Sequence, residues 1–101
     1  MKCNLHKSGA RGFKVSVPLS MLTMMRVKIG DTLDVALDET LQYAPRLTYS
    51  HKTYKLTKGR RKGTAYLTIP PRWVIQAKIN REDRFVDVSV SGTHLFIGRT
   101  S

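Results

Sequence analysis

Lysine and arginine side chains gather in one short stretch of the chain, Lys58-Gly59-Arg60-Arg61-Lys62. Its cations repel one another unless a polyanion or counterions neutralise them. Residues 40–81, which include this stretch, contain ten Lys and Arg residues and no Asp or Glu. The chemistry that such a pattern offers is contact with phosphate groups, for which charge and reach matter more than fixed geometry.

The composition of the whole chain favours the same chemistry. Its 101 residues include 18 Lys and Arg against 7 Asp and Glu, a formal net charge of +11. All the acids lie in two clusters, at residues 31–39 and 82–87. This excess of positive charge favours a nucleic-acid partner. A solvated basic loop remains the plain alternative, whereas no stretch combines a basic face with the long apolar helical face that a membrane surface would bind.

Catalytic and metal-binding patterns are missing from the sequence. The histidines at 6, 51 and 94 are scattered, and no spacing of His, Cys and carboxylates predicts a zinc site. Cys3 has no identifiable activating base. We therefore expect no enzyme activity, no catalytic residue, no metal and no cofactor. The single cysteine, the missing signal peptide and the lack of a membrane span predict a cytoplasmic protein, nucleoid-associated if prokaryotic.

The chain repeats one pattern twice. Residues 15–18 (VSVP) align with residues 67–70 (LTIP) at an offset of 52, and both read apolar, hydroxyl, β-branched, proline. Downstream, Asp31 aligns with Asp83, and upstream the offset is 51. We expect a tandem repeat with halves at 1–44 and 45–101. The join at Ala44-Pro45-Arg46 is too short for a flexible linker, so the halves should form a single compact domain over 1–101.

Each half is expected to contain a strand, a basic glycine-containing loop, a strand that stops at proline, a short helical turn and two more strands. The ranges are 2–7, 8–12, 13–17, 19–26, 32–37 and 41–43 in the first half, and 49–58, 59–63, 65–69, 71–78, 85–90 and 93–98 in the second. Arg26 and Lys78 should end the helical turns and complement their dipoles. The side chains of Met21, Met24, Met25 and Trp73 are expected in the core.

At these residues the chain resembles the AbrB/MazE family of swapped-hairpin DNA-binding domains. The resemblance is carried by KSGARGFKVSVP at 7–18 and VKIGDTLDV at 27–35, and more loosely by IPPR at 69–72 and INRED at 79–83. It implies a mostly β fold, a small AbrB-like barrel built from two homologous halves, each with one short helical turn. The two halves would form a pseudo-dimer within one chain, which leaves open a further homodimer.

The resemblance also implies a binding site, because family members contact DNA with the first loop and the start of the next strand. Carried over position by position, the nucleic-acid-binding residues are Lys7, Arg11 and Lys14 in the first half and Lys58, Arg60, Arg61 and Lys62 in the second. Tyr66 aligns with Lys14, so the two half-sites should differ. Pseudo-symmetry should bring the two basic loops together on one face.

Three functional hypotheses follow. The first is a DNA-binding transcription regulator or DNA-coating factor that contacts the phosphates of double-stranded DNA. The second is an antitoxin-like or phage- or plasmid-type inhibitor of a host or cognate protein. The compact, non-acidic end of the chain, FIGRTS at 96–101, counts against the antitoxin version. The third is a small RNA-binding protein, which a preference for RNA over duplex DNA would indicate.

Overall fold

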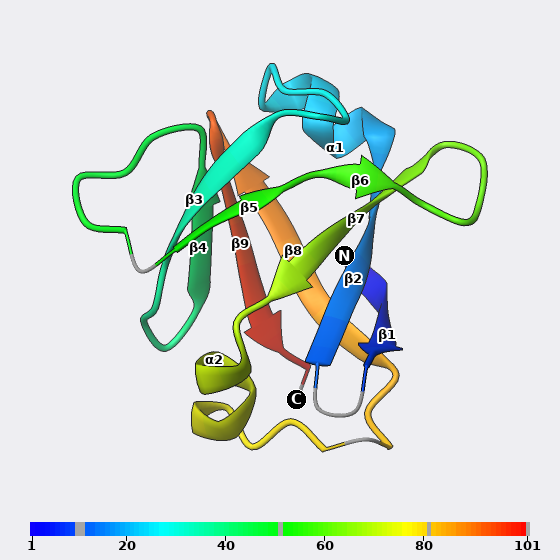
Figure 1. Ribbon diagram of the computed structural model, residues 1–101, viewed down its shortest axis with the longest axis vertical. Coiled ribbons are helices and arrows are strands. Elements are labelled where there is room, and N and C mark those ends of the chain that lie inside the picture. Colours follow the sequence, from blue (N-terminus) through cyan, green and yellow to red (C-terminus); the bar gives the residue numbers. More distant parts are fainter. Residues whose placement is uncertain (10–11, 51, 81, 101) are drawn as a thin grey trace.

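The computed structural model describes residues 1–9, 12–50, 52–80 and 82–100 of the chain. They form nine strands and two short helices (Figure 1), which confirms the mostly β fold. The strands are β1 (Lys2–Ser8), β2 (Gly12–Pro18), β3 (Thr32–Ala36), β4 (Leu41–Ala44), β5 (Lys52–Lys55), β6 (Thr57–Lys58), β7 (Thr64–Ile69), β8 (Phe85–Ser91) and β9 (His94–Arg99). The helices are α1 (Leu19–Met24) and α2 (Pro71–Gln76), which lie at opposite ends of the strands.

The strands form one antiparallel sheet in the order β5-β3-β4-β9-β8-β1-β2-β7-β6. Its two edge strands, β5 and β6, follow each other in the chain and are separated only by Leu56, so this segment nearly closes the sheet into a barrel. The Leu56 N–H donates to the Asp31 carbonyl at 2.8 Å, and its carbonyl accepts from the Gly30 N–H at 2.9 Å. The strand predicted at 49–58 therefore begins at Lys52 and is interrupted at Leu56.

The strand pairings have an approximate two-fold symmetry. β2 pairs with β7 so that Val15 lies opposite Leu67, the residue with which it aligns in the sequence. The pairing of β1 with β8 has its counterpart in β5 with β3, and the β3–β4 hairpin has its counterpart in β8–β9. The symmetry axis passes between Val15 and Leu67, through the wall of the barrel.

Each helix ends in the same turn. Arg26 and Lys78 have left-handed backbone conformations, with φ of 62° and 58°. The N–H of the next residue donates a hydrogen bond to a carbonyl of the helix. Val27 donates to Leu22 and Ile79 donates to Val74, both at 3.0 Å. The prediction that the helical turns extend to Arg26 and Lys78 was wrong. Both helices end two residues earlier, because the chain must reverse direction there to enter the next strand.

One residue of each acidic cluster has a structural role in the turn that follows the helix. The Asp31 carboxylate accepts a hydrogen bond from the Lys28 N–H at 2.9 Å. The Asp83 carboxylate accepts one from the Asn80 N–H, also at 2.9 Å. The acids that align in the two halves thus make equivalent contacts.

Alternate residues of the strands fill the barrel. From β2 and β7 these are Phe13, Val15, Val17, Ala65, Leu67 and Ile69. Trp73 is fully buried, and its indole N–H donates to the Glu39 carbonyl at 3.3 Å. Met21 and Met25 are buried as predicted, but Met24 is 63% exposed because it lies on the outer side of the short helix α1. Within the described residues, no helix is long and apolar enough to cross a membrane.

Candidate nucleic-acid interface

The outer face of β1, β2 and β7 carries a compact polar cluster. Side chains alternate between the two faces of a strand, so the residues between the core positions point away from the barrel. They include His6 on β1, Lys14 and Ser16 on β2, and Tyr66 on β7, all of them half-buried. The symmetry axis between Val15 and Leu67 passes through this outer face.

The members of this cluster contact one another. His6 Nε2 lies 3.0 Å from the Ser16 hydroxyl. The His6 ring meets the Tyr66 ring edge-on, with centroids 5.4 Å apart. Lys14 Nζ lies 4.0 Å from the centroid of the Tyr66 ring, a cation–π contact. Lys14 is therefore held near the centre of the face by the residue with which it aligns in the other half.

The electrostatic environment of His6 links this outer face to the basic loop. Burial lowers the pKa of His6, and the positive charges of Lys14, Arg60 and Arg61 lower it further. His6 is therefore mostly neutral at pH 7. The loop at 59–63 lies beside the outer face, since Arg61 lines a cavity together with Ser16 and Pro18.

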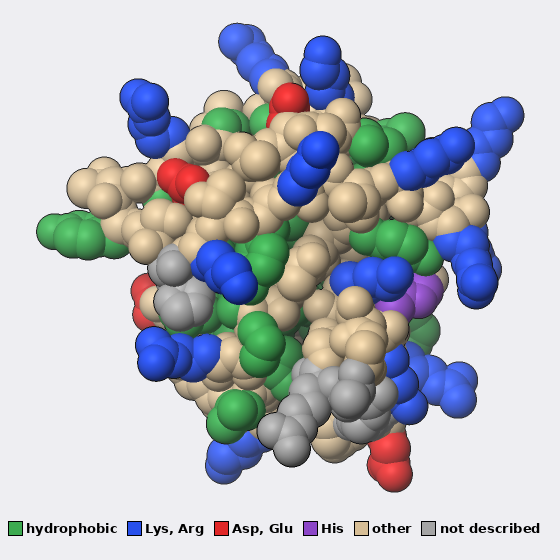
Figure 2. Space-filling view, in the orientation of Figure 1, with side chains coloured by type: hydrophobic (Ala, Val, Ile, Leu, Met, Phe, Trp, Pro, Cys, Tyr) green, Lys and Arg blue, Asp and Glu red, His purple; other side chains and the backbone are tan. Residues whose placement is uncertain are grey.

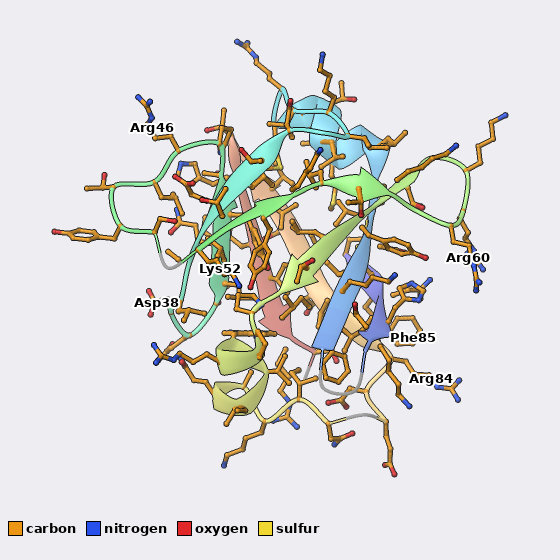
Figure 3. All side chains as sticks on the ribbon, in the orientation of Figure 1. Asp38, Arg46, Lys52, Arg60, Arg84 and Phe85 are labelled. Carbon is orange, nitrogen blue, oxygen red and sulfur yellow. The ribbon has the colours of Figure 1, made fainter. Side chains whose placement is uncertain are left out.

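The basic loop has a fixed backbone and exposed cations. Gly63 has a φ of +81°, and a side chain at Gly59 would meet the Thr64 carbonyl oxygen at 2.8 Å. The Thr64 hydroxyl donates to the Arg61 carbonyl at 2.7 Å. Arg60, Arg61 and Lys62 are all exposed, and Figure 3 shows Arg60 extending outward from the loop. This combination holds three exposed cations above a well-defined turn.

The two basic loops lie at opposite ends of the β2–β7 pair, so the expectation that they would come together was wrong. β2 and β7 run antiparallel, with Phe13 opposite Ile69 and Pro18 opposite Thr64. β2 begins at the bottom of Figure 1, whereas the β6–β7 loop lies at the upper right. The seven residues of β2 separate the loops by about 20 Å at ~3.3 Å per residue. The loops thus flank the outer face. Arg11 lies outside the described residues.

The acidic residues nearest this face lie on β8, where the exposed Asp87 pairs with Lys2 of β1, and in the turn before β8. His6 and Lys7 line a cavity of about 500 Å³ together with Glu82, Asp83 and Arg84, so this acidic pair borders the outer face at one end. At the other end, the Asp31 backbone is hydrogen-bonded to Leu56, two residues from Lys58. The sequences of β1, β2 and β7 contain no Asp or Glu. Of the predicted site residues, the structure therefore brings Lys14, Arg60 and Arg61 around a surface whose three strands carry no acid, and leaves Lys7 and Lys58 nearer to the acidic clusters.

Figure 2 shows the side of the molecule that carries β5, β6 and β7. Lys and Arg side chains surround it, and the few visible Asp and Glu side chains lie toward its margin. Sequence reasoning missed His6, Ser16 and Phe85 at the outer face. Phe85 is 43% exposed and pairs with Asn4 of β1. Alternation within the first hairpin could have placed His6 beside Lys14, but Phe85 comes from a strand near the other end of the chain.

The described residues offer little for other chemistry. They hold no group of three or more His, Cys, Asp and Glu side chains that could bind a metal ion. Cys3 is buried, and this burial raises the pKa of its thiol, which disfavours the reactive thiolate.

The fold and the surface together define a class: a small antiparallel β barrel with two-fold strand pairing and a cationic outer face. No protein-family model, curated protein sequence or solved structure matches the chain.

Proposed function

We propose that this protein binds double-stranded DNA with the outer face of β1, β2 and β7 toward the duplex. The observation that carries the proposal is the cationic surface of β1, β2 and β7, whose strands contain Lys14 and no acid and which is flanked by the exposed Arg60, Arg61 and Lys62. The resemblance to the AbrB/MazE family supports the same partner and suggests a transcription regulator or DNA-coating factor in the cytoplasm or nucleoid.

The cations of the loop suit contact with phosphates. Arg60, Arg61 and Lys62 are exposed and extend from a fixed turn, so they can reach the DNA backbone without refolding the loop. An arginine can also donate two hydrogen bonds to a guanine edge in the major groove. The two loops are about 20 Å apart, less than the ~34 Å of one helical turn. The molecule itself extends 32 Å along its longest axis, so one molecule would cover about one turn of the duplex.

The two ends of the site should bind with unequal strength. Residues 59–63 contain three cations, whereas the aligned residues 8–12 contain only Arg11. Lys14 also has no cationic counterpart, because the aligned residue is Tyr66. We infer that the loop at 59–63 makes the stronger phosphate contacts.

The test is a fluorescence anisotropy titration of labelled duplex DNA at several salt concentrations. The triple variant Arg60→Gln, Arg61→Gln and Lys62→Gln should bind more weakly. The slope of log K against log salt should become shallower by about 2.7, at ~0.9 for each phosphate that the variant no longer neutralises. The matched control, Arg46→Gln, Lys52→Gln and Arg72→Gln, removes the same charge from exposed positions away from the loop. Arg46 and Lys52 are labelled in Figure 3, and Arg72 lies on α2, at the opposite end of the strands.

Two results would overturn the proposal. If both triple variants showed the same fall in affinity and slope, binding would depend on total charge and not on this surface. If RNA displaced the labelled duplex at equal concentration, the partner would be RNA, which proteins recognise mainly through single-stranded bases and the 2′-hydroxyl.

A further inference from the structure

An apolar groove runs beside the basic loop. A cavity of about 480 Å³ is lined on one side by residues 58–64 and on the other by Leu19 and Ile29. A second cavity, of about 340 Å³, shares Leu19 and Ile29 and continues along Leu22 and Val27. Leu19 and Ile29 are each 37% exposed. The groove thus has an aliphatic floor and a wall of arginine and lysine side chains.

The walls of this groove are fixed by backbone hydrogen bonds. The Leu19 N–H donates to the Gly63 carbonyl at 2.9 Å, which joins the start of α1 to the end of the loop. The Gly30 N–H donates to the Leu56 carbonyl at 2.9 Å, which holds the turn that carries Ile29. A ligand would therefore enter a groove that is already formed, with little ordering cost.

The two halves differ where symmetry would otherwise give them the same groove. Leu19 aligns with Pro71, and the cationic loop at 59–63 aligns with residues 8–12, which hold a single Arg. The combination of an aliphatic floor with several cations therefore belongs to the end of the barrel near α1.

We propose that the groove binds an acidic peptide segment of a partner protein. An aliphatic or aromatic side chain of the peptide occupies the floor between Leu19 and Ile29, and its carboxylates pair with Arg60 and Arg61. Charge complementarity selects this occupant, because a neutral peptide would leave the cations unpaired. The loop is also the proposed phosphate contact, so peptide and DNA compete. This competition rests on the proposed function, whereas peptide binding does not.

The probe is a fluorescein-labelled acidic peptide with leucines at positions i, i+3, i+4 and i+7 among glutamates. The control peptide has serine in place of each leucine. We expect the leucine peptide to bind at least tenfold more tightly than the serine peptide. Ile29→Ser should remove most of this difference, whereas Ile75→Ser, an exposed isoleucine on α2, should leave it unchanged. Unchanged Trp73 fluorescence would verify that both variants remain folded.

The outcomes separate the two proposals. Equal affinity for both peptides, or no effect of Ile29→Ser, would overturn the groove as a peptide site. If the leucine preference persisted while duplex DNA failed to bind, the proposed function would be wrong and the groove would stand. If DNA and the leucine peptide bound together without displacing each other, the shared use of Arg60 and Arg61 would be wrong. Ile29→Ser should keep the wild-type affinity for DNA.

Discussion

His6 gives the outer face a dependence on pH. Burial and the charges of Lys14, Arg60 and Arg61 lower the pKa of His6 in the free protein. DNA phosphates placed over this face would raise that pKa, so the complex would take up a proton that the free protein does not hold. We expect the affinity for duplex DNA to rise as the pH falls below about 6.5, and His6→Gln to flatten the rise. Anisotropy titrations across this pH range at constant salt measure it.

Protonation of His6 should lower the stability of the free protein, whereas it should raise the affinity for DNA. A lowered pKa means that the folded protein binds this proton less well than the unfolded chain. The contribution of His6 to stability is therefore present above its unfolded pKa of about 6.5 and is lost as the pH falls through the folded value. His94→Gln serves as the control, since His94 lies on β9, away from the outer face. Equal pH dependence in His6→Gln and the wild type would contradict the role of His6.

At the scale of elements, the turn after each helix stores backbone strain. Arg26 has a φ of 62°, a region that costs a residue with a Cβ about 1–2 kcal/mol. Arg26→Gly relieves this strain but adds about 0.4–1 kcal/mol of unfolded-state entropy. We expect a net stabilisation of about 0.5–1 kcal/mol, measured by urea unfolding followed through Trp73 fluorescence. Lys28→Gly, outside the left-handed region, should instead destabilise. A similar loss of stability in both variants would refute this account of the turn.

The regular elements could be predicted where their signals are local. β2 and β7 match the expected strands at 13–17 and 65–69 to within one residue at each end, because alternation and a terminal proline are properties of the segment itself. The interruption at Leu56 could not be predicted, since it depends on hydrogen bonds to Gly30 and Asp31, which lie far away in the chain.

The candidate site shows the same limit. Charge pointed to the cations of the loop at 59–63, and the resemblance to the AbrB/MazE family added Lys14. The contacts of His6 with Ser16 and Tyr66 require β1 to pair with β2 and β2 with β7. The second of these pairings joins opposite halves of the chain, and no local pattern specifies it.

At the scale of the whole molecule, neither half closes the sheet by itself. β1 pairs with β8 and β5 pairs with β3, so the first strand of each half is completed by the third strand of the other. A half-chain would leave these strands and much of the core exposed, and it would be too small to compensate. Covalent connection of the halves also allows their surfaces to diverge, which a symmetric homodimer does not permit.

For the proposed DNA binding, this divergence predicts an asymmetric target site. The two-fold pairing places equivalent backbone segments at the two ends of the outer face. Their side chains differ, because Tyr66 occupies the position equivalent to Lys14. Selection from a random duplex pool should therefore yield sites of about one helical turn with base preferences concentrated in one half. Tyr66→Lys adds a cation to the half that already holds the loop at 59–63, so it should make the two halves less even and steepen the salt slope by about 0.9. Tyr49→Lys adds the same charge at a position that is 84% exposed and off this face, and should change neither. A perfectly palindromic site selected by the wild-type protein would contradict this account, because only equivalent half-sites favour such symmetry.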